Sequence, residues 1–208
     1  MDWTMVVGYV AAVIGAFYVL PQTVRVIRVG TSAGLSALTW QLQVGASTGW
    51  TVHGFLTGQV NVWACNIVVL SSAAIILKVI RRDRRLPWLV WIPAVITAAT
   101  LVSVDLLFGS VVYGSLIIVP MTVSMMIQFR ALWVAPDFRG YSWFYNVFAS
   151  FTQVLWLIYA FGNHERAIQL GASATLVLQM LSLALYLVKR AGVALPGVES
   201  AHHIASAS

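Results

Sequence analysis

Charged residues are scarce in this chain of 208 residues. Lys, Arg, Asp and Glu together make up 9% of the sequence, whereas 60% of the residues are hydrophobic. An average soluble domain carries about 25% charged residues. The composition therefore indicates an integral membrane protein.

Cysteine is almost absent as well. The single Cys65 excludes a disulfide within the chain, and we expect it to be a small core residue. No basic segment precedes the first apolar run, so we expect that run to stay as a membrane span and not to be cleaved as a signal peptide. The small, polar tail 192–208 is predicted to be disordered, with His202 and His203 solvated and not bound to a metal.

Several kinds of chemistry have no residues to support them. The chain has no phosphate-binding loop, no Lys in the middle of its last apolar segment, no paired carboxylates, no His cluster and no nucleophile–base set. We therefore expect no enzyme activity, no cofactor and no metal. Asp, Glu, Lys and Arg are missing from the middle of every apolar segment, which argues against proton coupling. His53 could titrate, but its place near the end of its segment predicts an interfacial residue.

What the chain does have is seven apolar segments, each close to the roughly 20 residues that a membrane-spanning helix needs. We predict an all-α integral membrane protein with spans at 4–27, 36–56, 60–80, 87–107, 111–133, 141–161 and 167–188. The short connections predict that neighbouring helices are antiparallel.

Basic residues fix the predicted orientation. The net charge of +6 could suggest a nucleic-acid partner, but Lys and Arg gather at alternate ends of the successive segments. With the N-terminus outside, 11 of the 12 basic residues lie in the cytoplasm, and only Arg166 lies outside. We therefore predict a multi-pass protein of the plasma membrane, with the C-terminus in the cytoplasm and no nucleic-acid partner.

Two parts of the chain resemble each other at an offset of 106 residues. Gly34-Leu35-Ser36 corresponds to Gly140-Tyr141-Ser142, and Trp50 corresponds to Trp156. Each copy has three spans, which is an odd number. The chain therefore needs one linker span before the second copy can cross the membrane in the same orientation as the first. We predict a first triple-helix bundle at 1–82, a linker helix at 83–110 and a second, parallel triple-helix bundle at 111–191. A binding site is expected near the midplane where two such repeats meet.

Pro21 and Pro120 lie inside the first and the fifth apolar segment. Pro21, followed by Gln22, removes one helical hydrogen bond and bends or opens the first span, and Pro120 is its counterpart in the fifth. We predict hinge or gate roles for these three residues, with a static kink as the alternative.

Polar and aromatic residues gather at one predicted depth. Trp50 and Asn66 each lie eight residues from Gly58, at the turn between antiparallel spans two and three, which brings them level. An aromatic face beside an amide suits a small, polar, ring-shaped ligand, whereas the alternative is helix–helix packing. Polar stripes on spans two, six and seven add candidate binding residues, namely Ser47 with Gln43, Gln153 with Asn146 and Ser150, and Gln169 and Ser173 with Gln179.

These residues resemble the PQ-loop/MtN3 superfamily, and specifically the SWEET and SemiSWEET sugar transporters. The resemblance rests on Pro21-Gln22, Gly34-Leu35-Ser36, Trp50 and Asn66, together with the 3+1+3 arrangement. It implies a sugar uniporter that works by alternating access, with Trp50, Asn66 and Trp156 around the sugar. The second Asn of the family is replaced by Ala172, and Ser173 or Gln169 is expected to substitute for it.

Three functions stay open at this point. The first is a facilitator for a mono- or disaccharide. The second is a carrier of the same fold for a nucleoside-like vitamin or an amino acid. The third is a membrane scaffold that transports nothing. Both predicted bundles lie in one chain, so a monomer is expected to suffice as a transport unit, and oligomers remain open.

Overall fold

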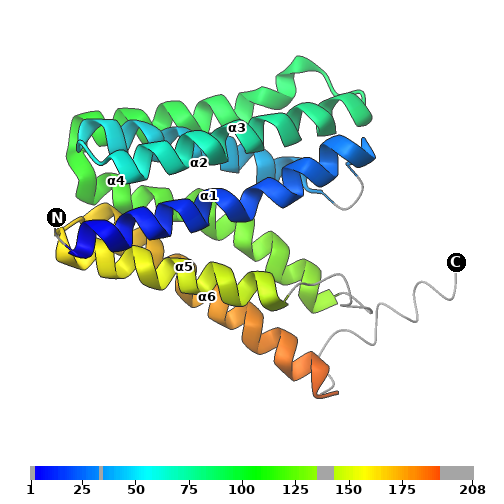
Figure 1. Ribbon diagram of the computed structural model, residues 1–208. Helices are drawn as coiled ribbons and strands as arrows, with labels where there is room; N and C mark the ends of the chain where they lie inside the picture. The colour runs from blue at the N-terminus through cyan, green and yellow to red at the C-terminus, as the bar shows by residue number, and fades with distance from the viewer. Residues whose placement is uncertain (1–2, 33–34, 135–142, 193–208) are drawn as a thin grey trace, which may run out of the picture.

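The computed structural model describes residues 3–32, 35–134 and 143–192. These residues are all-α, as predicted (Figure 1). The elements are α1 (Trp3–Val29), α2 (Ala37–Leu56), α3 (Val60–Asp83), the short 3-10 helix η1 (Trp88–Trp91), α4 (Ile92–Val134), α5 (Trp143–Gly162) and α6 (Arg166–Arg190). Positions 135–142, between α4 and α5, and all but the first residue of the predicted tail 192–208 lie outside the described residues.

The long helix α4 is broken at Gly109. It holds 43 residues, but Gly109 has a φ of 78° and a ψ of 179°, a conformation that glycine adopts at no steric cost. Figure 1 shows the chain turning back at this point, so α4 consists of two helical stretches that run in opposite directions. The described residues therefore hold six α-helical elements, whereas the sequence predicted seven segments. The predicted gap at 108–110 coincides with this break.

Within the described residues, four helical segments are long and apolar enough to cross a membrane. They are α1, α3, Trp88–Ile127 and α6, and a shorter apolar stretch, Asn146–Gly162, lies in α5. Large apolar side chains cover the outside of the bundle, such as Phe17, Leu107 and Val177. An apolar surface of this extent is what a lipid-facing bundle presents. The chain is therefore an integral membrane protein.

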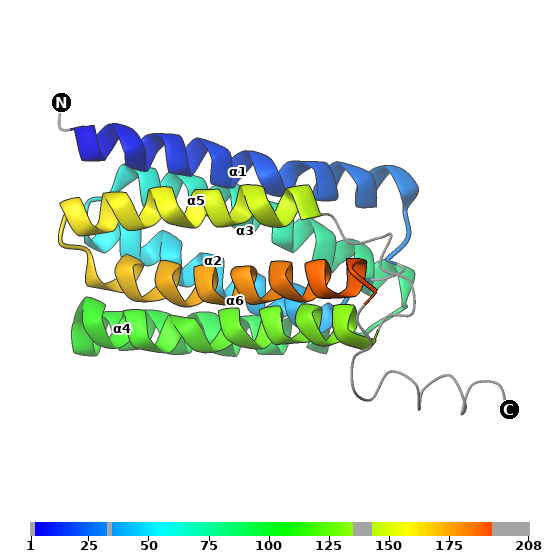
Figure 2. The ribbon, with the colours of Figure 1, turned by 90° about the horizontal axis from the view of Figure 1, so that it is seen from below.

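The helices pack as one bundle whose members run side by side (Figures 1 and 2). Helix α2 packs on α3 and α4, α6 packs on α4 and α5, and α1 packs on α3 and α5. In Figure 1, α5 and α6 lie close to the other helices on the left and diverge from α1 and α3 toward the right.

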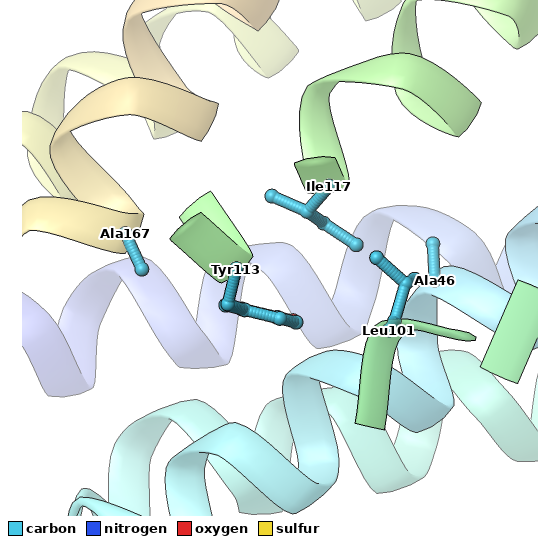
Figure 3. Close-up of a cluster of buried hydrophobic side chains, with 5 residues drawn as sticks. All are labelled: Ala46, Leu101, Tyr113, Ile117 and Ala167. Carbon is cyan, nitrogen blue, oxygen red and sulfur yellow. The ribbon is translucent and has the colours of Figure 1, made fainter. Parts of the chain in front are cut away.

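A buried cluster joins the two stretches of α4 to their neighbours (Figure 3). Leu101 lies before the break at Gly109, whereas Tyr113 and Ile117 lie after it, and all three pack with Ala46 of α2 and Ala167 of α6. Tyr113 and Ile117 are fully buried. This cluster holds the reversal of α4 against α2 and α6.

The bundle has two distinct ends. The N-terminal end holds the start of α1, the turns around Gly58 and His164, and the break at Gly109. The opposite end, here called the basic end, holds the clustered Lys and Arg residues. There Ser32 donates from its backbone N and from Oγ to Asp83 Oδ2, over 2.7 and 2.6 Å, and Arg84 donates to Leu35 O over 2.6 Å. These bonds tie the segment after α1 to the end of α3.

Candidate functional site

A cavity of about 120 Å³ lies inside the bundle. All six α-helices contribute to its wall, which has aromatic, amide and small apolar side chains. The lining residues are Gly15, Tyr18, Gln43, Trp50, Val62, Cys65, Asn66, Val69, Met121, Thr152, Gln153, Trp156, Ile168, Gly171 and Ala172. The predicted pair Trp50 and Asn66 thus meets Trp156 and Gln153 at one cavity.

Trp50 is held in place by neighbours on three helices. Its ring lies edge-on to Tyr113 of α4, with centroids 5.3 Å apart, and edge-on to His53, with centroids 5.7 Å apart. A Cβ atom added at Gly171 of α6 would lie 3.1 Å from Trp50 Cζ2, so this glycine gives the ring its room. These contacts hold the Trp50 ring in one orientation, in which it forms part of the cavity wall.

Asn66 offers a hydrogen-bond acceptor to the cavity. Its Nδ2 donates to the backbone oxygen of Val62, one turn earlier, over 2.9 Å. Within the described part of the chain, its Oδ1 accepts no hydrogen bond from protein. The amide is therefore held by its own helix, and one polar atom is left at the cavity wall for a ligand.

The second half of the chain supplies the opposite wall. Trp156 of α5 lines the cavity and lies edge-on to Tyr159, with centroids 5.8 Å apart, and Gln153 lies one turn before it. Ala172, at the position that corresponds to Asn66, is buried and lines the same cavity. The two Trp residues are thus paired across the site, whereas the Asn is not.

Three predicted binding residues lie outside the lining. Ser47 is fully buried and accepts a hydrogen bond from Gln43 Nε2 over 3.1 Å, so it supports a lining residue from behind. Gln169 Nε2 donates to the backbone oxygen of Ala160 over 3.0 Å, which ties it to the end of α5. Ser173 is exposed. Neither Gln169 nor Ser173 lines the cavity, because α6 turns its Ile168, Gly171 and Ala172 toward it.

The predicted hinge residues do not line the cavity either. Pro21 lies inside α1 and is exposed, Gln22 is half-buried beside it, and Pro120 lies inside α4 and is buried. The lining also includes residues that the sequence did not single out, among them Tyr18, Met121 and Thr152. A lone Tyr, Met or Thr in an apolar helix carries no pattern that separates a cavity wall from ordinary packing.

The prediction that His53 is an interfacial residue is wrong. His53 is fully buried, its Nδ1 lies 2.9 Å from Asp105 Oδ2 of α4, and its Nε2 lies 3.6 Å from Glu165 Oε2 at the start of α6. The second distance is an ion-pair contact and is longer than a hydrogen bond. The sequence placed His53 near the end of its segment, but only the packing of the helices brings it beside Asp105 and Glu165.

A second polar group closes the same N-terminal end. Tyr159 Oη of α5 donates to Gln59 Oε1 over 2.9 Å and lies 3.3 Å from Asn61 Oδ1. Nearby, Asn163 Nδ2 donates to Thr4 Oγ1 of α1 over 3.2 Å. These bonds join residues about 100 or more positions apart in the sequence, so they link the first and second halves of the chain.

Metal chemistry is not indicated in the part of the chain that the structure describes. No group of three or more His, Cys, Asp or Glu residues there has the arrangement of a metal site. Cys65 is a free thiol, buried at the cavity wall.

Known proteins resemble this chain in sequence and in fold. No family model matches the sequence. A sugar transporter named SemiSWEET from Escherichia coli (strain UMEA 3162-1) is 28% identical over 85 residues, which cover 41% of this chain and 96% of that protein. Among solved structures, a eukaryotic SWEET transporter superposes with a TM-score of 0.67 at 12% identity, over 91% of this chain and 100% of that one. The predicted resemblance is confirmed, and both similar proteins are transporters and not enzymes.

Proposed function

We propose that this chain, which has the fold of a full-length SWEET transporter and resembles SemiSWEET, moves a small neutral sugar across a membrane by alternating access. The observation that carries the proposal is the cavity where Trp50 and Asn66 of the first half meet Trp156 and Gln153 of the second. An aromatic face takes the apolar face of a sugar ring, and amide groups take its hydroxyls. The known activity of the similar proteins agrees with this chemistry.

The architecture that we propose is that of seven spans. The two stretches of α4, on either side of Gly109, each cross the membrane, the first as the linker helix of region 83–110 and the second as the start of the second bundle. Residues 1–82 and 111–191 then form parallel triple-helix bundles around the cavity. Because both bundles lie in one chain, one copy supplies a complete path.

Cavity size separates the candidate solutes. The cavity of about 120 Å³ is well below the roughly 300–1,000 Å³ of pockets for drug-sized ligands. A monosaccharide is therefore favoured over a disaccharide or a nucleoside, which are the larger candidates. Among the described lining residues no charged side chain occurs, so the ammonium and carboxylate of an amino acid have no counter-charge there.

The difference between the two ends of the bundle supports alternating access. Hydrogen bonds across the N-terminal end, such as Tyr159 to Gln59, hold the two halves together. Toward the basic end the helices of the second half diverge from α1 and α3 (Figure 1). With the N-terminus outside, as the distribution of Lys and Arg supports, this conformation is closed to the exterior of the plasma membrane. Pro21, Gln22 and Pro120 serve as the bending points between this state and the opposite one.

The transport is proposed to be passive. No charged side chain lines the cavity within the described residues, so solute binding there requires no ion. The solute therefore equilibrates across the membrane and is not accumulated.

Uptake into proteoliposomes tests the proposal. The purified chain is reconstituted, and influx of radiolabelled glucose, fructose, sucrose, a nucleoside and an amino acid is measured with and without a pH gradient. We expect monosaccharide equilibration with no accumulation against a gradient. Trp50→Ala and Asn66→Ala should each lower the rate about tenfold, the loss that about 1.4 kcal/mol of binding free energy produces.

Trp3→Ala is the matched control, because Trp3 is an exposed Trp at the start of α1. Its influx should equal that of the wild type. Absence of influx for every solute, with Trp50→Ala and Asn66→Ala behaving like the wild type, would reject transport in favour of a scaffold role. Accumulation driven by the pH gradient would reject the passive mechanism.

A further inference from the structure

His53 is the buried titratable residue that the sugar site does not use. Both of its ring nitrogens face carboxylate oxygens, Nδ1 at 2.9 Å from Asp105 Oδ2 and Nε2 at 3.6 Å from Glu165 Oε2. The side chain of His53 is fully buried, and those of Asp105 and Glu165 are 5% and 20% exposed. In the described part of the chain, the titratable groups that face His53 are these two carboxyls and the phenol of Tyr113.

The protons of this arrangement can be counted. A neutral imidazole carries one N–H, so it donates to one of the two carboxylates and turns a lone pair toward the other. When both carboxylates are ionised, the lone pair of the unprotonated ring nitrogen faces a negatively charged oxygen, and this contact is repulsive. One additional proton makes both ring nitrogens donors and removes the repulsion. The observed geometry, with one hydrogen bond at Nδ1 and a carboxylate 3.6 Å from Nε2, offers a place for this additional proton on Nε2.

Aromatic neighbours also suit a cationic imidazole. The ring of Tyr113 stacks on that of His53, with centroids 4.6 Å apart and an interplanar angle of 15°. A cation over an aromatic face is stabilised by the electron density of the ring. Contact with His53 lowers the pKa of Glu165, which lies in the turn before α6, below its ordinary value. These contacts favour the extra proton on His53 over one on Glu165.

The three residues come from parts of the chain that must separate if the N-terminal end opens. His53 belongs to α2 in the first half, Asp105 to the first stretch of α4, and Glu165 to the N-cap position of α6 in the second half. The contact from His53 to Glu165 therefore crosses between the halves. Opening of this end breaks it and exposes His53 to water, where an imidazole loses its proton near neutral pH.

We propose that His53, Asp105 and Glu165 form a proton-binding site, here called the proton latch, that binds one proton when the N-terminal end closes and releases it when that end opens. This inference rests on the proposed function, because it assigns the N-terminal end as one of the two openings of a transporter. It assigns the proton as a second ligand of the protein and places the proton site about one helical turn from Trp50.

The direction of the effect follows from linkage. Because the closed state holds the extra proton, raising the pH favours the open state, by up to about tenfold in the open-to-closed ratio per pH unit for one proton. The ring of Trp50, which lines the cavity, contacts His53 edge-on and so stands between His53 and the cavity. The proton is therefore taken up and released on the N-terminal side alone, so it sets the opening equilibrium and is not itself transported.

Distance measurement between spin labels tests the proton latch. Labels are attached to the pair Val60→Cys and Phe161→Cys, two exposed residues on opposite halves of the N-terminal end, in a Cys65→Ala background. Electron–electron resonance then gives the distance distribution in nanodiscs between about pH 5 and pH 9. We expect a short, closed distance at low pH and a growing population at longer distance as the pH rises.

Two variants separate a proton site from a merely structural contact. His53→Asn keeps a donor for Asp105 but cannot titrate, so its distance distribution should not respond to pH. Glu165→Gln offers a neutral donor to the imidazole, so this end should stay closed at every pH. His164→Asn is the matched control, because His164 is exposed, lies next to Glu165 and has a φ of 57° that Asn tolerates. It should retain the wild-type response.

Failure of the proton latch can be told apart from failure of the transport proposal. The proton latch is overturned if the distance distribution does not depend on pH, or if His53→Asn keeps the wild-type pH response. Either result counts against the proton latch even when the unlabelled chain, which keeps Cys65, transports sugar. A pH response lost in His53→Asn, with no sugar influx, supports the proton latch and overturns sugar transport. Acidification of the vesicle lumen in step with influx, read by a trapped pH dye, overturns one-sided proton exchange.

Discussion

The indole of Trp50 lies against the backbone of Gly171, so close that a single added Cβ atom would be 3.1 Å from Cζ2. Both residues line the cavity, one from α2 in the first half of the chain and the other from α6 in the second. The space for the ring thus depends on the absence of a side chain 121 positions later, a relationship that no local sequence pattern reveals.

Gly171→Val should therefore push the Trp50 ring into the cavity. We expect the KM for sugar influx to rise by about tenfold, since overpacking in a close-packed site displaces neighbours at a cost of about 1–3 kcal/mol. Helix stability should not fall, because Gly is a poor helix former. Ser173→Val, which adds bulk at an exposed position two residues later, is the control and should leave the KM unchanged. An unchanged KM in Gly171→Val would contradict the role of this contact.

Ala172→Asn should restore the second amide of the site. Ala172 is buried and faces the cavity at the position that corresponds to Asn66. A new hydrogen bond to a sugar hydroxyl contributes about 0.5–1.5 kcal/mol, so we expect affinity for a fully hydroxylated hexose to rise about two- to tenfold over a deoxy analogue. Competition between the two sugars for influx measures this preference. Loss of binding for both would show that this wall has no room for the amide.

Pro21→Ala tests the hinge in α1. The alanine supplies the backbone N–H that proline lacks and lets the hydrogen bond to the oxygen of Phe17 form, which straightens and stiffens the helix. We expect a lower maximal rate of exchange with little change in equilibrium sugar affinity, because Pro21 is exposed and does not line the cavity. Equilibrium binding and counterflow measure the two quantities separately. Equal rates for variant and wild type would rule out a hinge at this residue.

Tyr159→Phe should weaken closure of the N-terminal end. The change removes the hydroxyl that joins α5 to Gln59 and leaves the aromatic contact with Trp156 in place. Loss of a buried hydrogen bond costs about 0.5–1.5 kcal/mol, so we expect a fall of a few degrees in the melting temperature and a larger open population by the spin-label measurement. Tyr9→Phe, at a more exposed position on α1, is the comparison and should change neither.

Strong acid should also weaken this end, for a separate reason. The pKa of Glu165 is lowered chiefly by its contact with His53. A carboxyl whose pKa is depressed in the folded state stabilises that state above its ordinary pKa, and the contribution is lost as the pH falls through the folded value. The melting temperature should therefore fall below about pH 4. In Glu165→Gln this acid-dependent fall should shrink, and an identical acid profile would contradict the assignment.

Much of the candidate site could be predicted from the sequence, because the relative depth of its residues depends on distances along helices. Trp50 and Asn66 flank a turn at equal separations, and antiparallel packing brings such residues to one level whatever the rest of the fold does. Both lie at the cavity, together with Trp156 and Gln153. The assignment of Gln169 and Ser173 depended instead on which face α6 turns inward. An apolar membrane helix has no polar face to fix that rotation, and close contact at Gly171 decided it.

The prediction for His53 was wrong for a similar reason. Its position near a helix end predicted an interfacial residue, because the sequence gives depth but not neighbours. Asp105 and Glu165 lie 52 and 112 positions away, and the packing of α2 on α4 is what brings Asp105 beside His53.

By itself, the sequence determined that the chain is a helical membrane protein, where its helices begin and end to within a few residues, and that Trp50 and Trp156 correspond at an offset of 106 residues. These follow from hydrophobicity and from the regular rise of the helix, which are local properties. The tertiary structure decided which residues face the cavity and that His53 is buried between two carboxylates. Rotation of each helix about its axis is set by close packing with its neighbours, and that information is spread over the whole chain.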